Sequence, residues 1–170
     1  MLPQTIEAAL NDQIQTELHS AYIYLAMSAH FESSALPGCA HWMRQQAREE
    51  VGHAMRLFNY VNDRGGRVVL KAIDQPQKDF GAPKEVFEGA LKHEQHVTGT
   101  IHRLYELAVK ENDFATQSHL HWFIDEQVEE EKTAGDIVDL FDRAGDHEAA
   151  ILIIDQNLGA RSGEGEEEKE

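Results

Sequence analysis

Apolar residues recur every three to four positions over four long stretches of the chain, which is the periodicity of helices with one buried face. The sequence predicts these helices over residues 5–33, 39–64, 83–111 and 114–144. Pro37 and Gly38 break the pattern after the first helix, and Gly145 ends the fourth. Pro83 suits a first helical turn. We therefore expect an all-α fold.

The connections predict how the four helices are arranged. The first and last pairs are joined by links of a few residues, so each pair should form an antiparallel hairpin. The middle link, residues 65–82, carries Gly, Pro and a short apolar piece at 68–70. A helix of about 27 residues is roughly 40 Å long, and about eighteen extended residues span roughly 60 Å. The second and third helices are therefore predicted to be parallel and joined by one long crossover in a four-helix bundle.

A short fifth helix is predicted from a cap at Asp146 to Leu158. One side of it is apolar, with Ala150, Ile151 and Ile154 among its residues. A closed four-helix bundle leaves no obvious groove for this face, so we expect it to pack against other subunits. The alternative is that it folds back on its own bundle. Residues 161–170 predict a disordered acidic tail, which leaves one domain over residues 1–160.

Polar residues interrupt the apolar face of every long helix close to its midpoint, and the midpoints of similar helices meet in one layer of a bundle. The residues that this layer gathers are Glu17, Glu50, His53, Glu94, Gln127 and Glu130. Four buried carboxylates cannot all be ionised without compensation. Shared protons could neutralise some of them, whereas two divalent cations would balance all four. Oxygen ligands with one imidazole suit Fe(II), Mn(II) or Zn(II).

The spacing of the polar residues favours the metal interpretation. Glu50 and His53 are separated by three positions, so both project from one face of a helix and can bind one metal ion. Gln127 and Glu130 repeat this spacing on the fourth helix. A single Glu-x-x-His on an acidic helix is weak evidence, but the same interruption at the same height of four helices is strong evidence.

The composition of the chain argues against several classes of partner and location. The formal net charge of -16 argues against a nucleic-acid partner. The N-terminus lacks the pattern of a signal peptide, and no apolar run near either end is long enough to span a bilayer, so no membrane association is expected. The single cysteine, Cys39, excludes an internal disulfide, suits a reducing cytoplasmic compartment and is expected to be an inert small hydrophobe.

The helix order, the crossover and the polar layer together resemble the ferritins over about residues 1–160. This resemblance implies that Glu17, Glu50 and His53 hold one iron ion. Glu50 would bridge to a second iron ion, which Glu94 and Glu130 would hold. The implied function is ferroxidation of Fe(II) by O2 or peroxide, with storage of ferric mineral in a cage of twenty-four identical subunits.

The resemblance also implies roles for residues beside the iron pair. Gln127 would hydrogen-bond to the oxygen species or to a ligand, and Tyr24 matches a tyrosine that the family keeps beside its diiron centre. Bacterial non-haem ferritins have a third iron site near the inner surface. The residues that match it here are Glu49, Glu126 and Glu129. From the sequence alone, these three glutamates are more typical of a solvated charged face.

Two positions distinguish branches of the family. Bacterioferritins carry a second Glu-x-x-His on the fourth helix, where this chain has Gln127 and Glu130. They ligate haem through a methionine at the position of Gly52, so no haem is expected. A non-storage diiron peroxidase of the rubrerythrin type remains as an alternative. The fifth helix and the absence of a Cys-x-x-Cys segment count against it. A metal-free helical interaction module is the second alternative.

Overall fold

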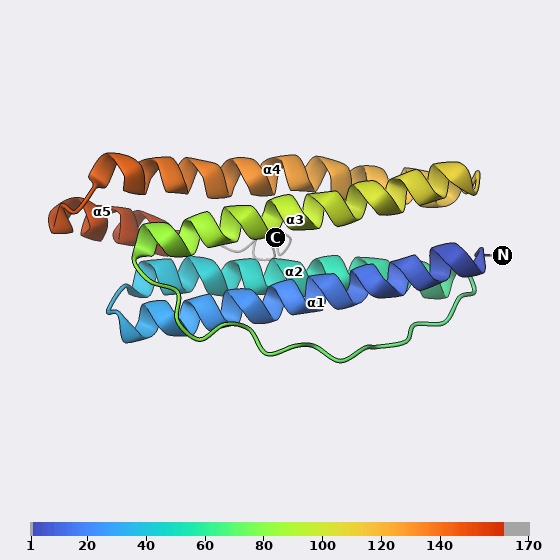
Figure 1. Cartoon of the computed structure of the whole chain (residues 1–170), viewed down its shortest axis with the longest axis horizontal. Coiled ribbons are helices and arrows are strands. Elements are labelled where there is room, and N and C mark those ends of the chain that lie inside the picture. The colour runs from blue at the N-terminus through green and yellow to red at the C-terminus, as the bar shows by residue number, and fades with distance from the viewer. Residues whose placement is uncertain (1, 162–170) are drawn as a thin grey trace, which may run out of the picture.

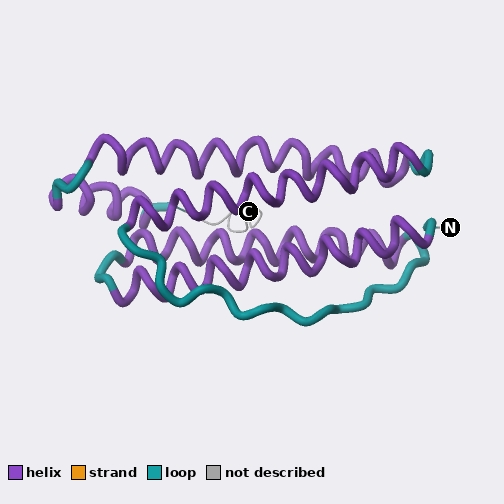
Figure 2. Tube along the Cα trace, in the orientation of Figure 1, coloured by secondary structure: helices purple, strands orange, loops and turns teal. Residues whose placement is uncertain are grey.

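The computed structural model describes residues 2–161, and within them all regular structure is helical (Figures 1 and 2). Its five helices are α1 (Gln4–Ser33), α2 (Pro37–Asp63), α3 (Pro83–Lys110), α4 (Phe114–Ala144) and α5 (Glu148–Gly159). The four long helices lie side by side as an elongated bundle, and α5 lies at the end where α4 finishes. The prediction of an all-α bundle with a short fifth helix is confirmed.

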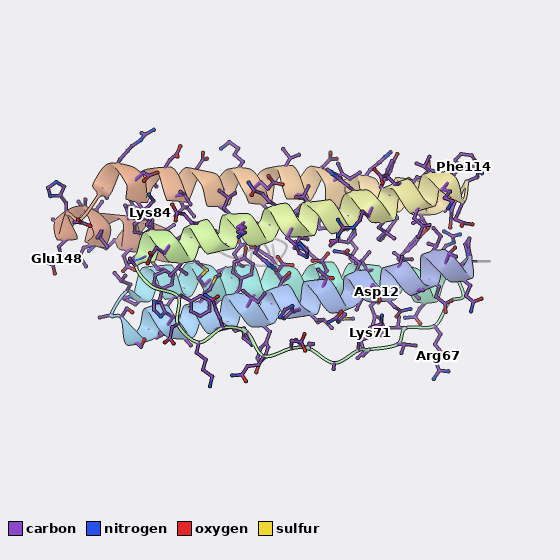
Figure 3. All side chains as sticks on the ribbon, viewed as in Figure 1. Asp12, Arg67, Lys71, Lys84, Phe114 and Glu148 are labelled. Carbon is purple, nitrogen blue, oxygen red and sulfur yellow. The ribbon has the colours of Figure 1, made fainter. Side chains whose placement is uncertain are left out.

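The topology follows from the lengths of the links. The short α1–α2 and α3–α4 links produce two antiparallel hairpins, and the long link returns along the bundle so that α2 and α3 run parallel (Figure 1). The crossover is attached to α1 by side chains rather than by strand pairing. Asn11 Nδ2 donates to the carbonyl of Arg67 at 3.0 Å, and its Oδ1 accepts from the Val69 amide at 2.7 Å. Further along, Lys71 of the crossover forms an ion pair with Asp12 (Figure 3).

Two predicted boundaries were wrong. Pro37 and Gly38 do not lie in the break between helices but form the first turn of α2, because proline needs no hydrogen-bond acceptor there. The break lies just before them, at Ala35, whose φ is 55°. Asp146 does not cap α5, since His147 occupies the N-cap position without a side-chain hydrogen bond.

The core consists of two apolar clusters, one toward each end of the bundle. One contains the aromatic residues Phe31, Trp42 and Phe87, and the other is largely aliphatic, with Leu10 and Ile101 among its members. Apolar residues at the helical spacing seen in the sequence, such as Ile6, Leu10 and Ile14 of α1, are buried in these clusters. The polar midpoint residues lie in the same helices at positions between those of the two clusters, so they are surrounded by packed apolar side chains.

The apolar face of α5 packs on its own bundle, which is the alternative that the sequence analysis did not favour. Ile154 is 7% exposed, and Ala150, Ile151 and Leu158 pack against the aromatic cluster. The helix lies against the first turn of α2, where the missing side chain of Gly38 lets the α5 backbone approach closely. The opposite side of α5, with its exposed Leu152 and Ile153, remains open for other contacts.

Among the described residues, no helix has the length and apolar character needed to cross a bilayer. The predicted acidic tail over residues 161–170 lies outside the described part of the chain, apart from Arg161.

Candidate metal centre

Glu17 of α1 and Glu50 and His53 of α2 meet inside the bundle because α1 and α2 form a tightly packed hairpin. One ligand atom from each residue lies within 4.8 Å of the other two, and all three residues are buried. His53 Nδ1 is 3.5 Å from Glu50 Oε2. Gln13, one turn before Glu17, donates to Glu17 Oε1 at 2.8 Å.

Two carboxylate oxygens of this group lack a hydrogen-bond donor among the described residues. Glu17 Oε2 and Glu50 Oε2 are buried and have no hydrogen-bond partner among the described residues. Buried polar atoms are rarely left unsatisfied, and unsatisfied atoms are costly in the absence of a compensating partner. A divalent cation, which prefers anionic oxygen and imidazole nitrogen, fits this arrangement.

A second possible ligand group contains His53 with Glu126 and Glu130 of α4. Glu126 and Glu130 are four positions apart and therefore lie on one face of α4. Glu130 was predicted beside Glu50 and Glu94, and their charges do act on one another, whereas Glu126 was assigned to a separate third site and here also lies near His53 and Glu130. Helical periodicity predicts which face of α4 Glu126 occupies but not how far α4 is rotated toward α2.

Glu94 of α3 lies fully buried in the same layer, but its carboxylate is engaged by neighbouring side chains. The Tyr24 hydroxyl donates to Glu94 Oε1, and Gln127 Nε2 lies 3.3 Å from Glu94 Oε2. Gln127 also donates to the Glu94 carbonyl at 3.2 Å. Tyr24 and Gln127 thus hold Glu94 in one orientation.

The three residues assigned to the third site do not share one environment. Glu49 is half-buried and forms an ion pair with Arg161 at 2.8 Å, Glu126 is half-buried, and Glu129 is exposed. Two residues that the sequence analysis overlooked also contact the predicted ligands. Gln46 Nε2 donates to Glu130 Oε2 at 2.8 Å, and Gln13 binds Glu17. Each glutamine lies one helical turn before a buried glutamate, a spacing that could have identified both.

Burial favours the protonated form of the carboxyl groups. Removal from water raises the pKa of Glu17 to about 7, although hydrogen bonds with Gln13 and Glu50 partly lower it. The pKa of Glu50 is raised well above its ordinary value by burial and then by the negative charge of Glu17. Burial likewise raises the pKa of Glu130 to about 8, and the charge of Glu94 adds to the shift.

Burial has the opposite effect on the imidazole. It lowers the pKa of His53 to about 4, and the positive charge of Arg56 lowers it further. The ring of His53 is therefore neutral at pH 7 and can bind a metal ion without losing a proton. The glutamates, in contrast, release protons when a metal ion binds to them.

These shifts predict that the metal-free protein loses stability as the pH rises from 6.5 to 8. Glu17 and Glu130 bind protons in the folded state up to about pH 7 and 8, but in the unfolded state only up to about 4.5. Below pH 6.5 the histidines with lowered pKa values oppose this trend, because they bind protons more readily when unfolded. We expect the thermal midpoint of the metal-free protein to be lower at pH 8 than at pH 6.5.

The corresponding binding measurement is Zn(II) titration across the same pH range. Binding should tighten with rising pH and release protons, detectable as a dependence of the calorimetric heat on the ionisation enthalpy of the buffer. A thermal midpoint that rises from pH 6.5 to 8, with no proton release on binding, would contradict the assignment of raised pKa values to these glutamates.

Comparison with known proteins identifies the family of this chain. The ferritin-like domain of the ferritin family matches residues 7–144. A bacterial non-haem ferritin of Bacteroides fragilis is 44% identical over 161 residues, covering 95% of this chain and all of that protein. Its counterpart in Staphylococcus aureus is 39% identical, covering 95% of this chain and 98% of that protein.

Solved structures show the same similarity in three dimensions. An open-pore ferritin from the archaeon Archaeoglobus fulgidus superposes with a TM-score of 0.95 at 43% identity, covering 95% of this chain and 100% of that chain. A closed form of the ferritin from that organism, engineered by mutagenesis, superposes with a TM-score of 0.94 at 44% identity, covering 95% and 99%. Because the family match covers residues 7–144 and solved ferritins share the fold, this chain belongs to the ferritin family.

Proposed function

We propose that this protein oxidises Fe(II) to Fe(III) at a dinuclear centre in each subunit, with O2 or peroxide as the electron acceptor. The ferric product is then stored inside a shell of identical subunits, twenty-four in number. The observation that carries this proposal is the pair of buried, unpartnered oxygens, Glu17 Oε2 and Glu50 Oε2, beside the neutral imidazole of His53. Ionised carboxylates in an apolar core are costly unless a cation or a proton compensates their charge, and two ferrous ions would compensate four of them.

In this proposal, two Fe(II) ions are the substrate of each centre. Glu17 and His53 hold the first, Glu50 bridges the pair, and Glu94 and Glu130 hold the second. Two ions held side by side each give one electron to a single oxidant. Anionic oxygen ligands favour the higher charge of Fe(III), and their protons leave when the ferrous ions enter.

Other side chains orient these ligands. Tyr24 and Gln127 position the Glu94 carboxylate through hydrogen bonds, and Gln127 also offers its amide to an oxygen species between the metal ions. Glu126 lies close enough to His53 and Glu130 to take iron leaving the pair. With Glu49 and Glu129, it forms the proposed third iron site. No haem is proposed, because Gly52 has no side chain to offer as a ligand. The single buried cysteine suits the proposed cytoplasmic location.

The proposal is tested with metal-free protein loaded anaerobically with Fe(II) and then exposed to air. We expect ferric absorbance to rise faster than in buffer alone, light scattering to report a particle of many subunits, and iron to remain with the protein after gel filtration. A non-storage diiron peroxidase would oxidise iron with peroxide but retain only about two ions per subunit. A metal-free interaction module would show no rise in thermal midpoint when Fe(II) is added anaerobically.

A further inference from the structure

Arg161, which follows the end of α5, is held by four side chains of α2. Its Nη2 donates to Glu49 Oε2 at 2.8 Å, and its Nη1 donates to Gln46 Oε1. The guanidinium carbon lies 5.0 Å from the ring centroid of Trp42, which is itself buried. His41 Nε2 donates to the Arg161 carbonyl at 2.9 Å. The main chain and the side chain of this arginine are therefore both fixed against the bundle.

Gln46 connects Arg161 to Glu130 of the proposed metal centre. Gln46 is fully buried, and its amide has one accepting oxygen and one donating nitrogen. Arg161 binds the oxygen, so the nitrogen is directed to Glu130 Oε2, 2.8 Å away. An arginine can only donate, which excludes the flipped orientation of the amide while the contact lasts. One guanidinium thus fixes the hydrogen bond to a proposed iron ligand.

The same guanidinium is a positive charge beside the carboxylate of Glu49, which belongs to the proposed third site. The Arg161–Glu49 pair is mostly shielded from water, with side-chain exposures of 24% and 12%. A metal ion that binds the Glu49 carboxylate meets the positive charge of Arg161 at 2.8 Å from Oε2. The two cations repel each other across one carboxylate, so each weakens the hold of Glu49 on the other.

We propose that Arg161 is a positioning residue that aligns Glu130 through Gln46 and competes with a divalent metal ion for Glu49. This inference rests on the proposed function and adds a link between the third site and the orientation of Glu130. Iron entering the third site releases Arg161, and the release frees the Gln46 amide that orients Glu130. Arg161, directly after α5, and the third site are therefore coupled.

The first test is Zn(II) titration of the assembled protein, since Zn(II) binds similar ligands without redox chemistry. The variants are Arg161→Ala, Arg161→Lys and the control Arg143→Ala, which removes an equal charge from the exposed end of α4. We expect Arg161→Ala to tighten the weakest class of Zn(II) sites about tenfold, because one competing charged contact is lost. Arg161→Lys should be intermediate, since lysine keeps the charge but not the two-point geometry. Arg143→Ala should match the unmodified protein.

The second test follows the displacement itself. The chain has two tryptophans, so Trp122→Phe leaves Trp42 as the sole indole reporter. Because Arg161 lies over the Trp42 ring, its departure should change the fluorescence of Trp42. We expect Zn(II) to shift the emission of Trp122→Phe protein and to leave that of the Trp122→Phe, Arg161→Ala double variant unchanged.

The two proposals fail in different ways. If the Zn(II) isotherms of Arg161→Ala and the unmodified protein coincide, or if the Trp42 response persists without Arg161, competition by Arg161 is refuted while the metal centre stands. If the unmodified protein binds no Zn(II) or Fe(II), the proposed function fails and this inference falls with it.

Discussion

Replacing Glu50 with Gln is expected to lower the initial rate of Fe(II) oxidation by at least about 100-fold, since even residues that only orient metal ligands typically contribute 10–100-fold. The amide introduced by Glu50→Gln would keep the shape of the side chain and could still donate a hydrogen bond to Glu17. It would lack the second anionic oxygen that a bridging ligand needs. The measurement is ferric absorbance after aerobic mixing of Fe(II) with metal-free protein.

The same substitution should raise the stability of the metal-free protein. Burial and the charge of Glu17 raise the pKa of Glu50 well above its ordinary value, so its ionised form opposes folding. A neutral amide removes that cost, and the thermal midpoint at pH 8 should rise by several degrees. Loss of activity together with a gain of stability distinguishes a functional carboxylate from a structural one.

The matched control is Glu106→Gln, which removes one carboxylate from an exposed position of α3. It should leave both the oxidation rate and the thermal midpoint unchanged. A Glu50→Gln protein that oxidises iron at the unmodified rate would remove Glu50 from the centre. One that melts earlier at pH 8 would show that Glu50 contributes to stability as an ion.

Replacing Gly38 with Ala is expected to detach α5 from the bundle. A Cβ atom at this position would lie 1.7 Å from the Asp155 carbonyl oxygen, a backbone atom that cannot move aside alone. Separation of the two helices would break the hydrogen bond in which the Cys39 amide donates to Asp155 Oδ1 at 2.8 Å. It would also expose Ile154. The expected loss of stability is about 3 kcal/mol.

The measurement is hydrogen exchange of the α5 amides, combined with the thermal midpoint and the particle mass. In Gly38→Ala protein, exchange over residues 148–159 should accelerate strongly while the four long helices stay protected. Gly135→Ala is the control, because a Cβ there meets nothing within 4 Å. In the middle of α4, alanine should stabilise the protein by about 1 kcal/mol. Equal protection of α5 in Gly38→Ala and unmodified protein would refute the close-approach argument.

The sequence by itself determined the helices, the topology and the candidate polar layer. Helical periodicity is a local property, so the face occupied by Glu17, Glu50 or Glu94 can be read from its neighbours. Link lengths are equally local, and they predicted the parallel α2–α3 pair. The interruption of four apolar stripes at one height indicated a cation site, because four carboxylates in a core require compensation.

Only the tertiary structure decided which side chains meet in that layer and what the end of the chain contacts. The rotation of α4 about its own axis brings Glu126 toward His53, while Tyr24 and Gln127 engage Glu94. Periodicity assigns an angle within one helix, but the rotation and shift between helices depend on the packing of all side chains at their contact. The docking of α5 depends on the close approach that a glycine permits. The placement of Arg161 follows from that docking, which no local pattern encodes.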